Sequence, residues 1–153
     1  MSKTLPNKTL DDLNRHILEE LQKDARLSTV EIGRRVGLSP PAVADRIQKL
    51  EDQGIIKSYQ TVLDFDKMGL TIRAFISFKP AQIKHPELFK LVDSLPEVVE
   101  WHTITGNYAF LLKVAVCSSE KLAALIERLE EFGETNTSLI LTQNPTQKIV
   151  LLP

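Results

Sequence analysis

The sequence predicts an α+β protein of two domains. We expect an N-terminal helix-turn-helix (winged-helix-like) domain and a C-terminal ferredoxin-like βαββαβ domain. Three observations predict this fold class: two helix signals joined by only two residues, a turn-rich stretch after them, and then alternating strand and helix patterns to the end of the chain. The expected domains span residues 1–60 and 68–153, with a linker at 61–67.

The first helix signal lies within residues 28–54. Ser28 and Glu31 have the spacing of a capping box, in which each side chain binds the backbone of the other residue. This motif predicts a helix over 29–36. Gly37 follows, and glycine readily adopts the positive φ that ends a helix.

The second helix begins only two residues later. Ser39 is a suitable N-cap, and Pro40 suits the first helical position, where a missing N–H does no harm. So short a connection forces a steep crossing, and Gly33 lets the two backbones approach closely. The apolar residues that we expect to face the core are Val30, Ile32, Val36, Leu38, Val43, Ile47 and Leu50.

The opposite face of the second helix is small or polar, which suits a helix that enters the DNA major groove over 39–49. Candidates for base edges or close backbone approach are Ser39, Pro40, Pro41, Ala44, Asp45 and Gln48. Candidates for phosphate contacts are Arg46 and Lys49, with Arg34 and Arg35 either touching phosphate or solvated. An ordinary αα-hairpin inside a helical domain has similar geometry, so geometry alone leaves both interpretations open.

Bulk properties restrict the class of protein. Residues 1–56 carry nine Lys/Arg and nine Asp/Glu, so attraction to phosphate depends on local clustering of the cations. No apolar run is long enough to span a membrane, and the N-terminus lacks an apolar signal core. The single Cys117 fits a reducing compartment and is expected to be a buried thiol. We therefore expect a cytoplasmic protein.

The C-terminal pattern from Leu70 onward follows the order βαββαβ. The Gly106-Asn107 pair predicts a two-residue hairpin between the second and third strands, and the third strand is apolar enough to be central. The expected strands are 70–79, 98–105, 108–117 and 135–143, with helices after Pro86 and Ser118, a further strand at 55–63 and an edge strand at 148–152.

Two helices cover one face of such a sheet, and the other face also carries apolar residues. We expect these to include Phe75, Trp101 and Leu111. Because an uncovered apolar face calls for a partner, the sequence predicts a homodimer through this face.

No pattern for catalysis stands out. The chain has no Ser/His/Asp spacing, no phosphate-cradling glycine loop and no Cys/His metal set, and its histidines at 16, 85 and 102 are scattered. We therefore expect no enzyme activity, no catalytic residue, no metal and no cofactor.

The N-terminal residues closely resemble the leucine-responsive regulatory protein (Lrp/AsnC, or feast/famine) family, and the layout of the second domain is similar as well. The resemblance implies a sequence-specific DNA-binding transcriptional regulator whose homodimers often assemble into octamers. The residues that carry it are Asp12, Ile17, Leu18, Asp24-Ala25-Arg26, Gly37-Leu38-Ser39-Pro40, Val43, Arg46-Ile47, Leu50-Glu51 and Gly54-Ile55-Ile56.

The resemblance also implies an amino-acid effector site between dimers. The matching positions are Gly106, Asn107, Tyr108, Thr135, Asn136 and Thr137. The family commonly reads Gly-Asp-Tyr-Asp where this chain reads Gly106-Asn107-Tyr108-Ala109, so both acids that suit an ammonium are missing. A different ligand, a weaker one or none remain open, as does the interpretation that these residues only form a turn and an edge strand.

Two alternatives to the regulator stay open at this point. Siroheme decarboxylases resemble this family and share its pair of domains, and they are the enzyme alternative. The intact capping and core pattern of residues 28–54 argues against them, because an enzyme has no need of a groove-facing helix. A purely structural dimer is the other alternative.

Overall fold

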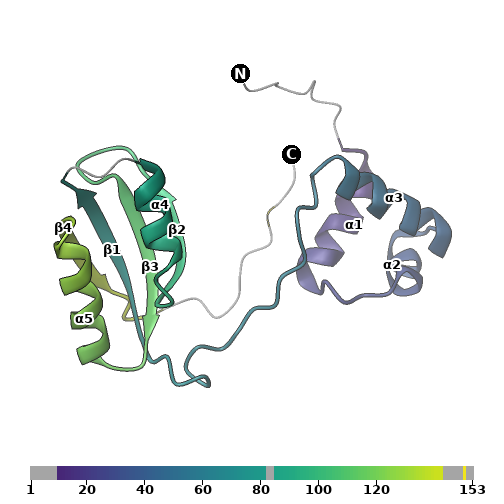
Figure 1. Ribbon diagram of the computed structural model, residues 1–153. Coiled ribbons are helices and arrows are strands. Elements are labelled where there is room, and N and C mark those ends of the chain that lie inside the picture. Colours follow the sequence, from purple (N-terminus) through teal and green to yellow (C-terminus); the bar gives the residue numbers. More distant parts are fainter. Residues whose placement is uncertain (1–9, 82–84, 143–149, 151–153) are drawn as a thin grey trace. The chain divides into compact units, whose positions relative to one another are not determined.

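The computed structural model describes residues 10–81, 85–142 and 150. The chain forms two compact units that divide between Val62 and Leu63 (Figure 1). The first unit contains three helices and the second a four-stranded sheet with two helices. In chain order the elements are α1 (Asp12–Lys23), α2 (Thr29–Val36), α3 (Pro40–Asp52), β1 (Ile72–Pro80), α4 (His85–Asp93), β2 (Val98–Thr103), β3 (Phe110–Val116), α5 (Ser119–Glu130) and β4 (Gly133–Leu139).

The predicted helix-turn-helix is confirmed by α2 and α3. Ser28 and Glu31 form the complete capping box, and Gly37 ends α2 with a φ of 74°. Ser39 is the N-cap of α3 and Pro40 its first residue. The two helices are therefore joined as the spacing of their caps predicted.

The core of the first unit is small and fully buried. Ile17 of α1, Ile32 of α2 and Val43 of α3 have no exposed surface, and Leu50 is also buried. The expectation that Val30 faces inward is wrong, since its side chain is 53% exposed. Val30 lies two residues before Ile32, which is more than half a turn around the helix, so the two cannot share the core-facing side.

The predicted strand at 55–63 is not formed. The residues after Gly54 begin with a bend at 55–56, have no regular secondary structure as far as residue 63, and form no ladder with any described residue of the chain. A β-strand is defined by hydrogen bonds to a neighbouring strand, so alternation of side chains does not produce one by itself. The predicted edge strand at 148–152 lies outside the described residues except for Val150, whose backbone pairs with the side-chain amide of Gln22.

The second unit has the predicted ferredoxin-like layout. Its strands lie in the order β2-β3-β1-β4, and every neighbouring pair is antiparallel. The prediction that the third strand is central is confirmed, because β3 pairs with both β1 and β2. The β2–β3 connection is wider than the predicted two-residue hairpin: Ile104 donates to the carbonyl of Ala109 at 2.9 Å, which leaves four residues in the loop.

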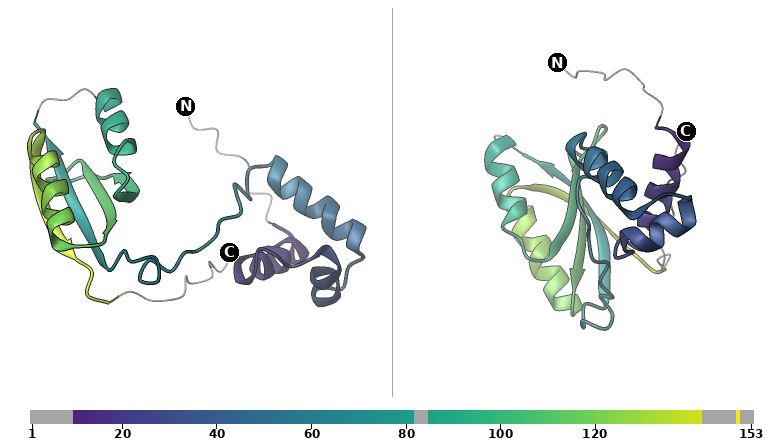
Figure 2. Two further views of the ribbon diagram at one scale, coloured as in Figure 1. Left: turned by 60° about the horizontal axis from the view of Figure 1, so that its bottom comes forward. Right: turned by 90° about the vertical axis from the view of Figure 1, so that its right-hand side faces the viewer.

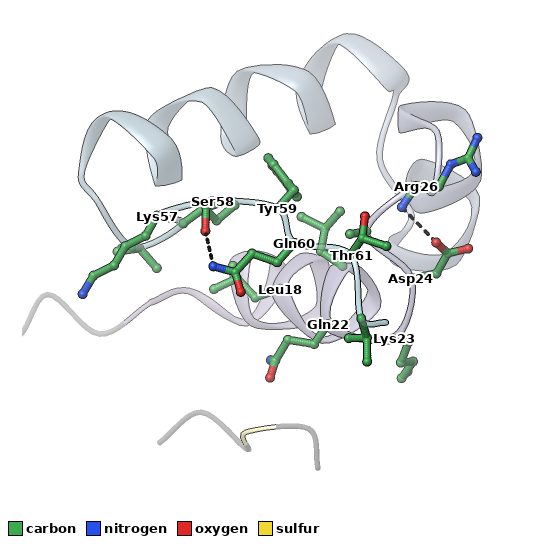
Figure 3. Close-up of a pocket in the computed structure, with 15 residues that line it drawn as sticks. Leu18, Gln22, Lys23, Asp24, Arg26, Lys57, Ser58, Tyr59, Gln60 and Thr61 are labelled. Carbon is green, nitrogen blue, oxygen red and sulfur yellow. Dashed lines mark hydrogen bonds between the residues drawn. The ribbon is translucent and has the colours of Figure 1, made fainter. Parts of the chain in front are cut away.

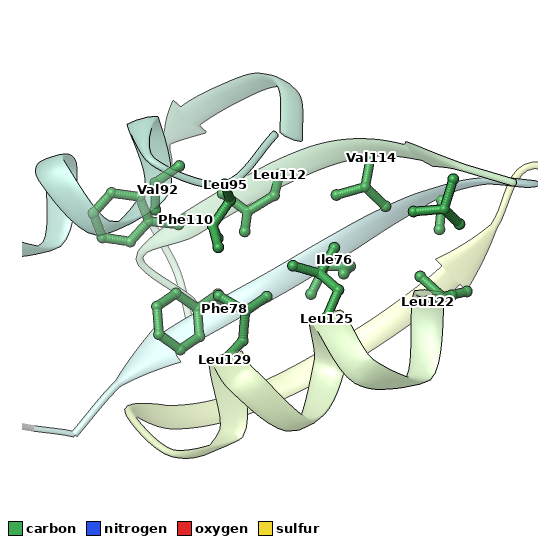
Figure 4. Close-up of a cluster of buried hydrophobic side chains, with 12 residues drawn as sticks. Ile76, Phe78, Val92, Leu95, Phe110, Leu112, Val114, Leu122, Leu125 and Leu129 are labelled. Carbon is green, nitrogen blue, oxygen red and sulfur yellow. The ribbon is translucent and has the colours of Figure 1, made fainter. Parts of the chain in front are cut away.

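Both helices of this unit lie on one side of the sheet (Figure 2), and the core lies between them and the sheet (Figure 4). Alternate residues of the central strands point into it. The most buried members are Ala74, Ile76 and Phe78 of β1, Phe110, Leu112 and Val114 of β3, Leu125 and Leu129 of α5, and Val92 of α4.

Trp101 is on this helix-covered side, so the expectation that it lies on the open face is wrong. Its indole stacks on Phe89 with ring centroids 5.3 Å apart and donates to Asp93 at 2.9 Å. A register shift between Val98 and Glu100 inserts one residue into β2 and inverts the alternation beyond it. Cys117 is also exposed, not buried as expected, because it lies just past the end of β3.

Candidate nucleic-acid interface and effector site

The outward surface of α3 is polar and exposed, as a groove-reading helix requires. Every residue expected at base edges is exposed: Ser39, Pro40, Pro41, Ala44, Asp45 and Gln48. The buried residues Val43 and Leu50 lie on the other side and anchor the helix to the core. The local helix period therefore brings these candidates together on one surface.

Two hydrogen bonds organise this surface along the helix. Lys49 Nζ donates to Asp45 Oδ2 at 2.7 Å, and Gln48 Nε2 donates to Asp52 Oδ1 at 2.9 Å. Both are i, i+4 contacts between exposed groups, so they are weak and exchange readily with other partners. DNA phosphates and bases are suitable replacement partners for Lys49 and Gln48.

The start of α3 exposes few backbone donors. Pro40 and Pro41 have no N–H, and the Ser39 side chain makes no cap hydrogen bond. The Ser39 hydroxyl is therefore not committed to its own helix. It lies at a position that the sequence predicted for a base-edge contact or close backbone approach.

The arginines that sequence reasoning assigned to phosphate have different surroundings. Arg34 is exposed on α2. Arg35 forms an ion pair with Glu20 of α1. Hydrogen bonds from Lys23 and then Arg35 lower the pKa of Glu20, so this carboxylate stays ionised and holds the two cations near α1. Arg46 points toward α1, where it meets Asp11 and Asn14.

The first unit also contains a groove that the sequence patterns did not indicate (Figure 3). It has a volume of about 750 Å³ and lies between α1 and residues 55–62. Tyr59 lies in its wall and donates to Glu51 Oε1 at 2.8 Å. Desolvation, followed by this hydrogen bond, raises the pKa of Tyr59 to about 12. Apolar lining residues are Leu18, Leu21, Ile55, Ile56 and Val62.

The residues expected at an effector site lie at one end of the sheet, on both sides of Phe78. Ala109, just after the loop, donates to the Phe78 carbonyl at 3.1 Å, and Thr135 pairs with Phe78 from the other side. Because β1 separates the two groups, they are about 10 Å apart. The members are Gly106, Asn107 and Tyr108 in the loop and Thr135, Asn136 and Thr137 on β4.

The β4 residues do not all point the same way. Thr135 and Thr137 pair with the core residues Phe78 and Ile76, whereas Asn136 pairs with Ser77 on the open face. The Thr135 hydroxyl donates to Glu130 Oε1 at 3.1 Å. This places a carboxylate beside the expected site, which sequence reasoning missed because Glu130 belongs to the preceding helix.

Two further features concern the described part of the chain, namely its possible metal-ligating groups and the character of its helices. No three His, Cys, Asp or Glu side chains gather there as a metal site would require. His102 lies beside Glu100 at 2.8 Å on β2. Among the described helices, none has the length and apolar character needed to cross a bilayer.

An exposed polar α3 held in a helix-turn-helix, followed by a separate ferredoxin-like unit, defines the class of DNA-binding regulators with an accessory domain. Comparison with protein families identifies residues 10–51 as an AsnC-type helix-turn-helix domain and residues 73–148 as an Lrp/AsnC ligand binding domain. The chain belongs to the Lrp/AsnC family of transcriptional regulators.

Individual relatives agree with this assignment. The HTH-type transcriptional regulator LrpB of Bacillus subtilis is 37% identical over 91% of this chain and 92% of its own length. The solved structure of B. subtilis LrpC has a TM-score of 0.85 at 32% identity and covers 91% of this chain and 99% of LrpC. A Neisseria meningitidis transcriptional regulator in complex with L-methionine has a TM-score of 0.86 at 27% identity, with coverage of 94% and 97%.

These relatives decide between the functions that the sequence left open. Their names describe transcriptional regulators, and the match covers both units of the chain. The protein is an HTH-type transcriptional regulator. The decarboxylase-like alternative finds no support among them.

Proposed function

We propose that this regulator binds specific DNA sequences as a homodimer, with residues 1–60 as the DNA-binding domain and 68–153 as the dimerisation and effector domain. The observation that carries the proposal is the polar, exposed surface of α3 opposite its buried Val43 and Leu50. In bacteria such as those that hold the relatives above, DNA lies in the cytoplasm, and we propose that location for this regulator as well.

The roles on this surface follow from chemistry. Gln48 can pair with adenine through its amide, and Asp45 can accept from the amino group of cytosine. Lys49 and Arg34 are suitable phosphate contacts. Ser39, Pro40, Pro41 and Ala44 allow close approach to the DNA. Two copies related by a twofold axis favour a near-palindromic site with half-sites about 10 bp apart or a multiple of that spacing.

Two features support dimerisation. Phe75 lies on the open face of the sheet with its side chain 38% exposed, and Leu111 shares that face. Residues 55–62 form no ladder with the described residues, so their backbone groups are available to pair with a second copy. Phe75→Asp is expected to yield a monomer in sedimentation analysis, whereas a variant that stays dimeric would contradict the sheet-face interface. Assembly of dimers into octamers is a further prediction.

An amino acid or a related small molecule is the proposed effector. The N. meningitidis neighbour carries L-methionine, and the matching end of this sheet has hydroxyls and backbone groups that suit a carboxylate. Glu130 is the proposed partner for the ammonium in place of the acids absent at Asn107 and Ala109. Calorimetry against the twenty amino acids tests this proposal. A response abolished by Glu130→Gln supports it, and silence across the set rejects an amino-acid effector.

A gel shift over a range of salt concentrations tests the DNA proposal, with the regulator's own upstream DNA beside an unrelated fragment. Phosphate contacts weaken with salt on any DNA, whereas base contacts persist on the specific fragment. We expect a band that survives on the upstream DNA after the control band has disappeared. Equal loss on both fragments would exclude this DNA as a specific site, and genomic selection would then search for others. Binding to none of the selected fragments would reject the proposal.

A further inference from the structure

Arg46 of α3 is directed at α1. Its Nη1 donates to Asp11 Oδ2 at 2.6 Å and to Asn14 Oδ1 at 2.9 Å. The Arg46 side chain is 27% exposed, in contrast to the 64% exposed Lys49 one turn further along the helix. The guanidinium therefore links α3 to the start of α1 through Nη1, and it is less exposed than the ammonium of Lys49.

Asp11 is suited to hold this guanidinium because its two oxygens have separate partners. Oδ1 accepts the backbone N–H of Asn14 at 2.7 Å and caps α1, while Oδ2 accepts from Arg46. The hydrogen bond from Arg46, followed by that from Asn14, lowers the pKa of Asp11, so the carboxylate is ionised at neutral pH. A charge-assisted hydrogen bond of this kind is stronger and more directional than a neutral one.

The surrounding charges do not favour a phosphate at this place. Arg46 lines a hollow of about 330 Å³ together with Lys49, Asp11 and Asp45. Its two cations are balanced by its two carboxylates, each already in an ion pair with the other sign. A phosphate bound in this hollow would lie close to both acids, which repel it.

The contact between Arg46 and Asp11 lies away from the apolar contacts between α1 and α3. The shared apolar cluster holds α1 at Ile17 and α3 at Val43 and Ile47. Asp11 lies six residues before Ile17, which is about 9 Å along the helix. A polar contact at that distance along α1 joins the start of α1 to α3 and restricts how the two helices rotate and tilt relative to each other.

We propose that Arg46 is a positioning residue, which with Asp11 and Asn14 fixes the angle at which α3 presents its base-reading side chains, and that it is not a phosphate contact. This inference rests on the proposed DNA-binding function. Removing the negative charge of Asp11 weakens specific DNA binding, although the loss of an acid near DNA ordinarily strengthens it.

The test uses the full-length protein and the variants Asp11→Asn, Arg46→Gln and the double variant. Asparagine is as good an N-cap as aspartate, so Asp11→Asn keeps the helix start while it removes the negative charge and replaces the oxygen that accepts from Arg46 with an NH2 group. The matched control is Asp12→Asn, which removes the adjacent acid, whose side chain is 89% exposed and pairs only within α1 with Arg15. Affinity for a selected specific site and for an unrelated fragment is measured against salt, well below the melting temperature.

We expect Asp11→Asn and Arg46→Gln each to weaken specific binding by about tenfold, the loss of one charged hydrogen bond. Binding to the unrelated fragment should change far less than specific binding, the salt slope should stay unchanged, and the double variant should be no worse than either single one. Asp12→Asn should bind at least as tightly as the wild type. A smaller specific-to-unrelated ratio is a signature that a uniform loss of stability does not produce.

Three results would overturn the inference. A salt slope reduced by about one in Arg46→Gln, with Asp11→Asn binding more tightly, would make Arg46 a phosphate contact. Unchanged specific binding in both single variants would show that the contact between Arg46 and Asp11 has no role in DNA recognition. If circular dichroism shows that Arg46→Gln unfolds the first unit, the DNA binding of Asp11→Asn alone decides whether the inference holds. Wild-type protein that selects no DNA would reject the proposed function itself, together with this inference.

Discussion

Leu38 donates its backbone N–H to the carbonyl oxygen of Gly33 at 2.9 Å, and the Leu38 carbonyl oxygen fills the space where a Cβ at position 33 would lie. The turn after α2 thus folds back onto the helix that precedes it. Val43 of α3 also lies within contact distance of the same point. The close crossing of α2 and α3 therefore depends on the absence of a side chain at Gly33.

Gly33→Ala is expected to destabilise the first unit. The added methyl meets backbone, which cannot move aside as a flexible side chain can, and overpacking of this kind costs about 1–3 kcal/mol. Urea denaturation followed by circular dichroism measures the loss. Gly37→Asn is the control, because Gly37 has open space around it and asparagine tolerates its positive φ. Equal stability of Gly33→Ala and the wild type would contradict the close crossing.

Leu50→Ala and Val30→Ala separate buried from exposed apolar residues of the first unit. Leu50 is 1% exposed, so its truncation should cost about 2–5 kcal/mol, and the first unit should melt before the second. Val30 is exposed, and its truncation should change the unfolding free energy by about 0.5 kcal/mol or less. Calorimetry of the full chain resolves both. If the two variants lose similar unfolding free energy, Val30 must be buried by a contact that a single copy of the chain does not make.

Lys49→Ala should weaken DNA binding evenly across sequences and reduce the slope of log affinity against log salt by about one. The reason is that Lys49 lies on the exposed side of α3 and its pair with Asp45 is weak enough to yield to phosphate. Affinities at several salt concentrations on two different sites provide the measurement. An effect that depends on base sequence would move Lys49 to the base-reading group.

Gln48→Ala should alter preference at one base position, at a cost of about 1–3 kcal/mol if the amide pairs with the edge of a base. Gln48 donates to Asp52 in the free protein and must exchange that hydrogen bond on binding. Selection from a randomised site, read out for the wild type and the variant, measures the change. A uniform loss at all positions would make Gln48 a backbone contact.

Tyr59 should ionise well above the usual pH range of a tyrosine. Its pKa of about 12, against 10.0 for an unperturbed phenol, reflects desolvation first and the hydrogen bond to Glu51 second. Because folding favours the neutral phenol, the stabilisation is complete below pH 10 and is lost as the pH rises through 12. Absorbance titration of Tyr108→Phe isolates Tyr59, the other of the two tyrosines. Glu51→Gln should lower the pKa of Tyr59, while desolvation keeps that pKa above 10. A Tyr59 pKa near 10 in the Tyr108→Phe protein would contradict the hydrogen bond to Glu51.

Local signals predicted most of the fold. The caps at Ser28 and Ser118, the stop at Gly37 and the order βαββαβ are set by residues close together in the chain, and the structure has all of them. The errors have a different origin. The face of Trp101 depends on one inserted residue in β2, and a strand at 55–63 depends on a pairing partner, neither of which alternation of side chains reports.

Some features of the candidate site were likewise set by the local sequence, and others were not. The sequence by itself determined which residues lie on the outer side of α3, because the helical period places every side chain relative to Val43 and Leu50. It also determined, through its resemblance, the family of the protein. Only the tertiary structure decided which partners the candidate residues have. Arg46 of α3 donates to Asp11 at the start of α1, and the Thr135 hydroxyl donates to Glu130 across the α5–β4 turn. Contacts between elements depend on how the elements pack, and packing is a property of the whole folded chain.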